Sequence, residues 1–177
     1  MKQVVKIILF VLASLGIAGA AFAQSPDKAA ADALAALYAS TPAARALGEN
    51  AKGILVFPNI RKAAALVGGQ SGKGVMVANG KVAGHYRADG VLVGLEAGAQ
   101  SFSYVVFFMS DKALQNLHES KGFEVGTEPN IVIANDGVAK NISTTTAQDD
   151  VYSYVFGQKG LMAGVSVQGL KITQLGH

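Results

Sequence analysis

The stretch from Gly90 to Met109, GVLVGLEAGAQSFSYVVFFM, constrains the fold most, because it alternates with the two-residue period of a β-strand. In its first half the odd positions from Val91 to Ala97 are apolar, whereas the even positions include two glycines and Glu96. Toward the end of the second half, from Phe102 to Met109, apolar residues occupy both faces, which is typical of a strand buried on both sides. The stretch therefore predicts two strands of a packed core, without evident chemistry.

The length and composition of the chain favour a single domain. It has 177 residues, of which 50% are hydrophobic, and this is enough for one substantial core. There is no cysteine, so disulfides cannot stabilise the protein and packing alone must hold it. We divide the chain into a signal peptide at 1–23, a helical segment at 24–50 and a β-rich domain at 51–177.

Residues 1–23 have the pattern of a secretory signal peptide. A short basic start with Lys2 and Lys6 accompanies an apolar run, and Ala21-Phe22-Ala23 forms a cleavage site before Gln24. An uncleaved membrane anchor is the alternative, because the run approaches the roughly 20 residues of a spanning helix. We favour cleavage after Ala23, which predicts a periplasmic protein with or without membrane association. Because residue 24 is not cysteine, a lipoprotein is excluded.

The charge of the exported chain argues against nucleic acid as a partner. Removal of Lys2 and Lys6 lowers the formal net charge from +3 to +1, since residues 1–23 contain no acid. Non-specific nucleic-acid binding requires a clearly basic surface. We therefore expect no nucleic-acid binding.

The alanine-rich segment 24–50 predicts two helices. Ser25 is a suitable N-cap and Pro26 suits a first helical position, while Thr41-Pro42 separates a second short helix that ends near Gly48. The first helix can lie on a membrane surface or dock on its own domain. We favour docking, because the helix lacks the bulky anchors and basic face of membrane-surface helices.

The remainder of the chain predicts short strands and tight turns. Asn79-Gly80 and Asp89-Gly90 are strong hairpin signals, so residues 74–98 should form a three-stranded antiparallel meander. The glycine-rich segment 68–74, GGQSGKG, favours a flexible hairpin loop. A tight turn is also expected at 158–160.

One helix and several later strands complete the predicted order. Ser110 is a plausible cap for a helix at 111–121, closed by Gly122. Strands are expected at 123–125, 131–134, 151–156, 161–167 and 170–175, with a turn at 135–137 and a polar loop or edge at 141–148. The whole predicts an α+β single domain, mainly an antiparallel β meander that closes into a barrel or sandwich.

The residues give no pattern for catalysis or metal binding. Cysteine chemistry is impossible, and His85, His118 and His177 are scattered without the spacing of zinc ligands. The GGQSGKG segment fails the P-loop pattern, because Lys73 is followed by Gly74 rather than Ser or Thr. We expect a protein that is not an enzyme and has no cofactor. Glu96 is the one acid expected to be buried, in a structural role.

Two segments share the pattern G-L-x-A-G, at 94–98 and 160–164. In a strand, Gly94 and Gly98 share one face, as do Gly160 and Gly164. Such glycines serve as bends or allow another backbone, a helix or a ligand to approach closely. Bends are favoured, and a ligand against the bare face is the alternative.

Four segments together resemble the SYLF domain family: AKGILVFPNIRKA at 51–63, GGQSGKGV at 68–75, GLEAGAQSFSYVVFFM at 94–109 and NISTTTAQDDVYSYVFGQKGLMAGVSVQGLKIT at 141–173. The resemblance implies a lipid-binding module. Eukaryotic relatives bind phosphoinositides, fungal members also bind actin, and exported bacterial relatives are described as lipid-binding proteins of the cell envelope. For an exported bacterial protein the implied partner is phospholipid or a membrane surface, and actin is not expected.

The resemblance also suggests where lipid binds. The basic residues within the matching motifs, expected to contact head groups, are Lys52, Arg61, Lys62, Lys73 and Lys159. Acyl chains are expected against the small-residue surface of Gly94, Gly98, Gly160 and Gly164. The alternative function is a structural envelope protein that acts through protein–protein association.

Overall fold

A computed structural model describes residues 24–119, 123–125, 131–134, 150–168 and 170–176. These residues form three helices and one sheet, which confirms an α+β fold. The elements are α2 (Pro26–Ser40), α3 (Pro42–Asn50), β1 (Gly53–Ala78), β2 (Lys81–Phe108), α4 (Asp111–Glu119), β3 (Phe123–Val125), β4 (Ile131–Ala134), β5 (Val151–Gln168) and β6 (Leu170–Gln174).

Strand β2 is the centre of the sheet. On one side it pairs with β1 from Lys81 to Phe108, and on the other with β5 and β6. Strand β3 extends the sheet beyond β6, and β4 extends it beyond β5 as the one parallel pairing. Among the described residues no pairing joins β3 to β4, so the predicted closure into a barrel is not observed.

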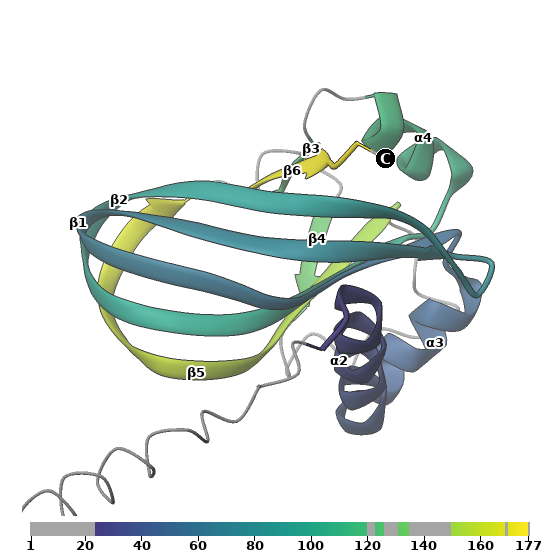
Figure 1. Ribbon diagram of the computed structural model, residues 1–177, viewed down its shortest axis with the longest axis horizontal. Coiled ribbons are helices and arrows are strands. Elements are labelled where there is room, and N and C mark those ends of the chain that lie inside the picture. Colours follow the sequence, from purple (N-terminus) through teal and green to yellow (C-terminus); the bar gives the residue numbers. More distant parts are fainter. Residues whose placement is uncertain (1–23, 120–122, 126–130, 135–149, 169, 177) are drawn as a thin grey trace, which may run out of the picture.

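Strand β1 turns back on itself at Leu66, which has a left-handed φ of 72°. A Cβ atom added to Gly68 would lie 2.5 Å from the Cα of Ala64, and one added to Gly74 would lie 2.5 Å from the ring of Phe57. The two arms of β1 therefore lie side by side. Figure 1 shows that β1, β2 and β5 curve round at the same end of the sheet, one outside the other. We call this end of the sheet the bent end.

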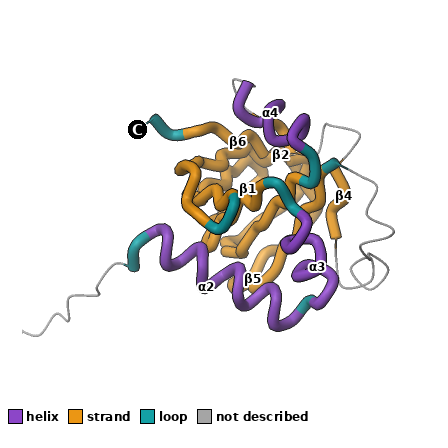
Figure 2. Tube along the Cα trace, turned by 90° about the vertical axis from the view of Figure 1, so that its right-hand side faces the viewer, coloured by secondary structure: helices purple, strands orange, loops and turns teal. Residues whose placement is uncertain are grey.

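The helices cover only the part of the sheet remote from the bent end. Helices α2 and α3 pack on one face, here called the outer face, and α4 packs on the opposite, inner face (Figure 2). The core beneath α2 and α3 contains Ala30, Leu37, Leu47, Val56, Val75, Val105 and Phe107. The core of the inner face contains Leu55, Phe57, Met76, Tyr86, Tyr104, Phe108 and Leu117.

The two N-terminal helices agree with the sequence prediction. Ser25 caps α2 by accepting a hydrogen bond from the Lys28 backbone N–H, and Thr41 separates the two helices. Ala30 and Leu37 of α2 are buried against the sheet, so the helix docks on its own domain as favoured. Helix α3 continues to Asn50, slightly beyond the predicted end.

Three predicted turns are wrong. Asp89-Gly90 lies within β2 because both of its sides are paired, Asp89 with Ser71 of β1 and with Lys171 of β6. The GGQSGKG segment is part of β1, opposite residues 86–92 of β2, rather than a loop. The segment 158–160 lies within β5, where only an irregularity in pairing opposite Ser101 and Ser103 remains. The turn at Asn79-Gly80 is confirmed between β1 and β2.

The later elements follow the predicted order. Helix α4 begins after Ser110, whose Oγ accepts a hydrogen bond from the Ala113 N–H at 3.1 Å. Strands β3 and β4 occupy the predicted residues. The predicted closure of the helix at Gly122, the turn at 135–137 and the polar segment 141–148 lie outside the described residues.

Candidate functional site

Four exposed basic residues lie on the outer face, between the helices and the bent end. Lys73 precedes Val75 by two residues and Ser101 precedes Val105 by four, so both share the face on which α2 packs. Pairing across the strands places the other residues on the same face. We call this set the basic collar; its members are Arg61, Lys73, Arg87 and Lys159.

One acid lies within the basic collar. Asp89 accepts hydrogen bonds from the Ser71 Oγ at 2.7 Å and the Arg87 Nε at 2.9 Å. Partial burial acts to raise the pKa of Asp89, but these hydrogen bonds outweigh it and hold the pKa below its ordinary value. Asp89 therefore compensates Arg87.

The other three members of the collar are uncompensated. Within the described part of the chain, Arg61, Lys73 and Lys159 form no ion pair. The collar thus carries a net positive charge on one face, the arrangement that attracts an anionic surface.

An open groove of about 650 Å³ lies beside the collar, between the arms of β1, β2 and β5. Across β1, β2 and β5, Arg61, Ser101 and Lys159 are paired in one row. Ala63 of β1 and Ala99 of β2 are paired in the next row. The residues that line it are Arg61, Lys62, Ala63, Gly69, Gln70, Ser71, Ala99, Gln100, Ser101, Lys159 and Gly160. The groove can accommodate a small polar or amphiphilic group beside two cations.

Lys62 and Glu96 form a buried ion pair. The Nζ of Lys62 lies 2.7 Å from the Oε1 of Glu96, and the two residues are 9% and 8% exposed. The predicted burial of Glu96 is confirmed. Its lysine partner, 34 residues away in the sequence, was not anticipated. Lys62 is therefore paired with Glu96 and buried, whereas its neighbour Arg61 is exposed.

The glycines of the two G-L-x-A-G segments, here called the signature glycines, lie where the backbones of neighbouring strands come very close. A Cβ atom at Gly98 would lie 2.3 Å from the carbonyl oxygen of Leu161, and one at Gly160 would lie 2.4 Å from that of Ala99. Both glycines also have left-handed φ values, 132° and 100°. The space above these glycines is therefore filled by the neighbouring backbone of the sheet.

The other two signature glycines belong to the same bend. Gly94 pairs with Ser166, and Gly164 pairs with Glu96, both across β2 and β5. The four glycines thus mark the bent end, in agreement with the favoured interpretation of bends and close backbone approach. They do not form a bare face along the groove, although Gly160 lines it.

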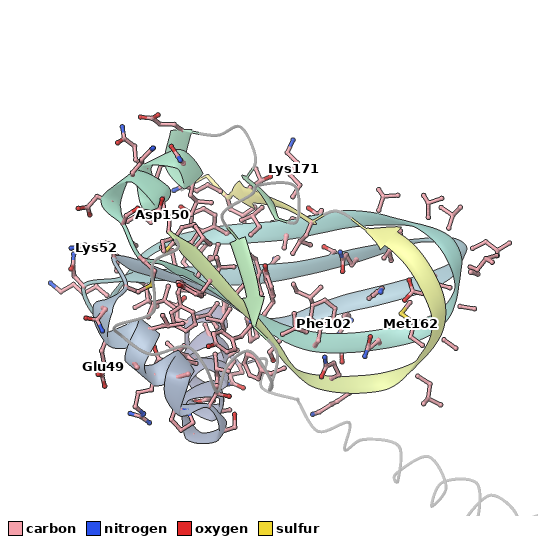
Figure 3. All side chains as sticks on the ribbon, turned by 180° about the vertical axis from the view of Figure 1, so that it is seen from behind. Glu49, Lys52, Phe102, Asp150, Met162 and Lys171 are labelled. Atoms are coloured by element: carbon pink, nitrogen blue, oxygen red, sulfur yellow. The ribbon has the colours of Figure 1, made fainter. Side chains whose placement is uncertain are left out.

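Exposed large apolar side chains gather at the bent end. We call them the apolar tip; they are Leu66, Val67, Val91, Val93, Leu95 and Leu161. Leu95 is 79% exposed and Leu161 is 88% exposed. The tip projects from the end of the sheet that the helices leave uncovered (Figure 3).

The sequence prediction placed this apolar face in the core, and that is wrong. Val91, Val93 and Leu95 are exposed, whereas Leu92 and Glu96 of the other face are buried. At the bent end the curved sheet encloses its own inner face. The opposite face, which carries Val91, Val93 and Leu95, is therefore exposed to solvent.

The structure brings some predicted site residues together and separates one. Arg61, Lys62, Lys159 and Gly160 line one groove. Lys73 lies on the same face in the other arm of β1, where it pairs with Arg87. Lys52 lies at the opposite end of the sheet, where its backbone N–H donates to the Phe108 carbonyl, and Figure 3 shows it near Glu49 and far from Met162.

Two further features bear on what the described residues can do. No group of three or more acidic, histidine or cysteine side chains within them is arranged to hold a metal ion. None of their helices has both the length and the apolar character needed to span a membrane.

Comparison with known proteins relates part of the chain to a family. Residues 89–176 match the family described as Ysc84: Las17-binding protein actin regulator, which contains the SYLF domain. No curated protein matches the chain. The match covers most of β2 and everything after it, including the bend of β2 and its pairing with β5. Residues 89–176 therefore match the SYLF domain family, which is associated with lipid and actin binding.

Proposed function

We propose that this protein is a non-enzymatic phospholipid-binding protein of the bacterial cell envelope. It makes reversible contact with anionic lipid, either as single molecules or at a membrane surface. The match to a family associated with lipid binding and the signal-peptide pattern of residues 1–23 both support this proposal. Phospholipid is a better partner than actin, because an exported bacterial protein does not meet actin.

The observation that carries the proposal is the uncompensated charge beside the groove. Arg61 and Lys159 flank Ser101 in one row across three strands, and Lys73 lies on the same face. A lysine or arginine near an anionic membrane is worth about 1 kcal/mol. Three such residues give weak, salt-sensitive attachment, which suits reversible contact with a membrane.

Sedimentation with vesicles tests this function. Protein purified from the cell envelope is mixed with vesicles of phosphatidylglycerol or of phosphatidylcholine at low and at physiological salt. We expect binding to the anionic vesicles only, and weaker binding as the salt concentration rises. No difference between the two kinds of vesicle would contradict the proposal.

A charge variant and its control sharpen the test. The double variant Arg61→Gln and Lys159→Gln removes about 2 kcal/mol of attraction, so binding should fall roughly 20- to 30-fold at low salt. Lys81→Gln removes an exposed charge near the turn between β1 and β2, away from the collar, and should leave binding unchanged. Equal losses in both variants would show that net charge, rather than the collar, controls binding.

The proposed envelope location is tested separately. N-terminal sequencing of the protein recovered from the periplasm should begin at Gln24. A first residue of Met1 in the membrane fraction would favour the uncleaved anchor.

A further inference from the structure

The surface of the bent end is uncharged. In the segments 63–70 and 90–100 the only charged residue is Glu96, and residues 160–170 contain none. Glu96 is buried and compensated by Lys62 at 2.7 Å. Moving an exposed charge from water into a medium of low dielectric constant has a prohibitive free-energy cost. The bent end can enter such a medium without this cost, because it has no exposed charge.

The backbone of β2, the central strand of the bent end, is paired with its neighbours. Residues of β2 from Gly94 to Ala99 pair with β5, and Ala65 of β1 pairs with Ala97. Hydrocarbon tolerates a polypeptide only where its N–H and C=O groups are bonded within the protein. The bent strands meet this condition along the edges that join β2 to β1 and β5, whereas beyond Tyr154 the outer edge of β5 has no strand partner among the described residues and fits the polar boundary of the bilayer rather than its centre.

The distance between the apolar tip and the collar fits a membrane interface. Leu161 follows Lys159 by two residues, about 7 Å along a strand, and Leu66 follows Arg61 by five, about 16 Å at most. Amphipathic elements that lie in the interface bury their apolar side chains about 5–10 Å into the boundary of head groups and acyl chains. When Leu161 reaches that depth, Lys159 lies at the level of the phosphates, and Arg61, in the same row of paired residues, lies beside it.

We propose that the apolar tip inserts into the outer acyl region of an anionic bilayer, with the basic collar at the head groups and the helices away from the membrane. The inference rests on the proposed lipid-binding function and specifies which surface binds and how it is oriented. Charge complementarity selects a bilayer as the occupant over a protein partner, because three uncompensated cations lie on one face behind an uncharged apolar end.

Single cysteine probes test this orientation, because the chain has no cysteine of its own. Leu161→Cys and Leu95→Cys place a thiol on the tip at the two most exposed apolar positions. Val82→Cys is the matched control, an exposed apolar residue next to the turn between β1 and β2. Each variant of the full chain is labelled with bimane and mixed with phosphatidylglycerol vesicles that contain lipids brominated at defined depths.

We expect the probes at 95 and 161 to shift to shorter wavelength and to be quenched by shallow brominated lipids, while the probe at 82 remains unchanged. Vesicle binding without quenching at 95 and 161, or with stronger quenching at 82, would overturn the orientation and leave the lipid-binding function intact. Failure of the unlabelled protein to bind any vesicle would overturn both. Crosslinking in cells from position 161 to a protein rather than to lipid would also overturn the inference.

A polar substitution provides a second, independent measurement. Leu95→Asn with Leu161→Asn should reduce the partition into anionic vesicles at least about tenfold, because two large apolar side chains no longer leave water. The circular dichroism spectrum and melting temperature should not fall, since both side chains are exposed in the free protein. Val82→Asn should bind as the unmodified protein does. Unchanged binding by the double variant would contradict insertion.

Discussion

The buried ion pair between Lys62 and Glu96 offers a sharp test of how the bent end is stabilised. Both side chains are about nine-tenths buried, and the charged atoms lie 2.7 Å apart. Lys62→Met leaves the carboxylate of Glu96 buried without its cation, and Glu96→Leu leaves the ammonium group without its anion. Each single variant therefore retains one buried charge from which the opposite charge of the pair has been removed.

The expected loss can be worked from the burial. Removal of one partner of a buried pair costs about 3–5 kcal/mol in the free energy of unfolding. In a chain of this size each kcal/mol lowers the melting temperature by about 2–4 °C, so a single variant should melt roughly 6–20 °C lower. The double variant Lys62→Met and Glu96→Leu has no buried charge and should recover most of this loss, because apolar replacements of similar volume are often neutral.

Thermal unfolding by circular dichroism, with urea titration for the free energy, provides the double-mutant cycle. Lys73→Met serves as a control, since Lys73 is exposed, and it should change stability by no more than about 0.5 kcal/mol. If each single variant costs less than about 1 kcal/mol and the double variant simply adds the two, the charges are not coupled. That result would refute the argument that Lys62 neutralises the buried charge of Glu96 inside the bent end.

Three further predictions concern stability. Gly98→Ala should destabilise strongly, because its Cβ would lie 2.3 Å from the Leu161 carbonyl oxygen at a φ of 132°; Gly69→Ala, whose nearest atom would be at 3.6 Å, should be tolerated, and equal melting temperatures would contradict the close strand approach. Leu37→Ala should cost about 2–5 kcal/mol in urea unfolding, because the side chain fills the contact of α2 with the sheet, and a loss below 1 kcal/mol would mean that α2 is not docked. Burial raises the pKa of Tyr104 to about 12 from 10.0, so the folded state binds this proton more tightly than the unfolded state does. The resulting stability, on the order of 3 kcal/mol, is present below pH 10 and is lost as the pH rises to 12. Tyr104→Phe should flatten that part of the stability profile, and an unchanged alkaline loss would contradict it.

Local signals in the sequence predicted the elements that depend on local chemistry. Ser25, Ser110 and the Asn79-Gly80 turn act through their own backbone neighbours, and all three are found as expected. The bend at Leu66 has no such signal, because leucine does not favour a left-handed φ and the neighbouring strands impose it. The Asp89-Gly90 pair shows the reverse: its turn propensity yields to strand pairing on both sides.

The candidate site was predictable only in part. Arg61, Lys73 and Lys159 were found through the resemblance, and the structure places them on one face. The pairing of Lys62 with Glu96 depends on the nesting of β1 inside β2, which no sequence period encodes. The apolar alternation from Val91 to Leu95 was correctly identified as strand, but periodicity gives two faces and does not say which one meets solvent.

The nesting of the strands also orders the assembly of the fold. β1 and β2 are joined by a tight turn, so they can pair as soon as both have been synthesised. The outer edge of β2 must wait for Val151–Gln174, and until then a long row of unpaired N–H and C=O groups borders an apolar surface. Such an edge is a template for pairing with another chain. The segment that completes the sheet thus also protects the half-folded chain from aggregation, which gives the C-terminal strands a role in biogenesis distinct from binding.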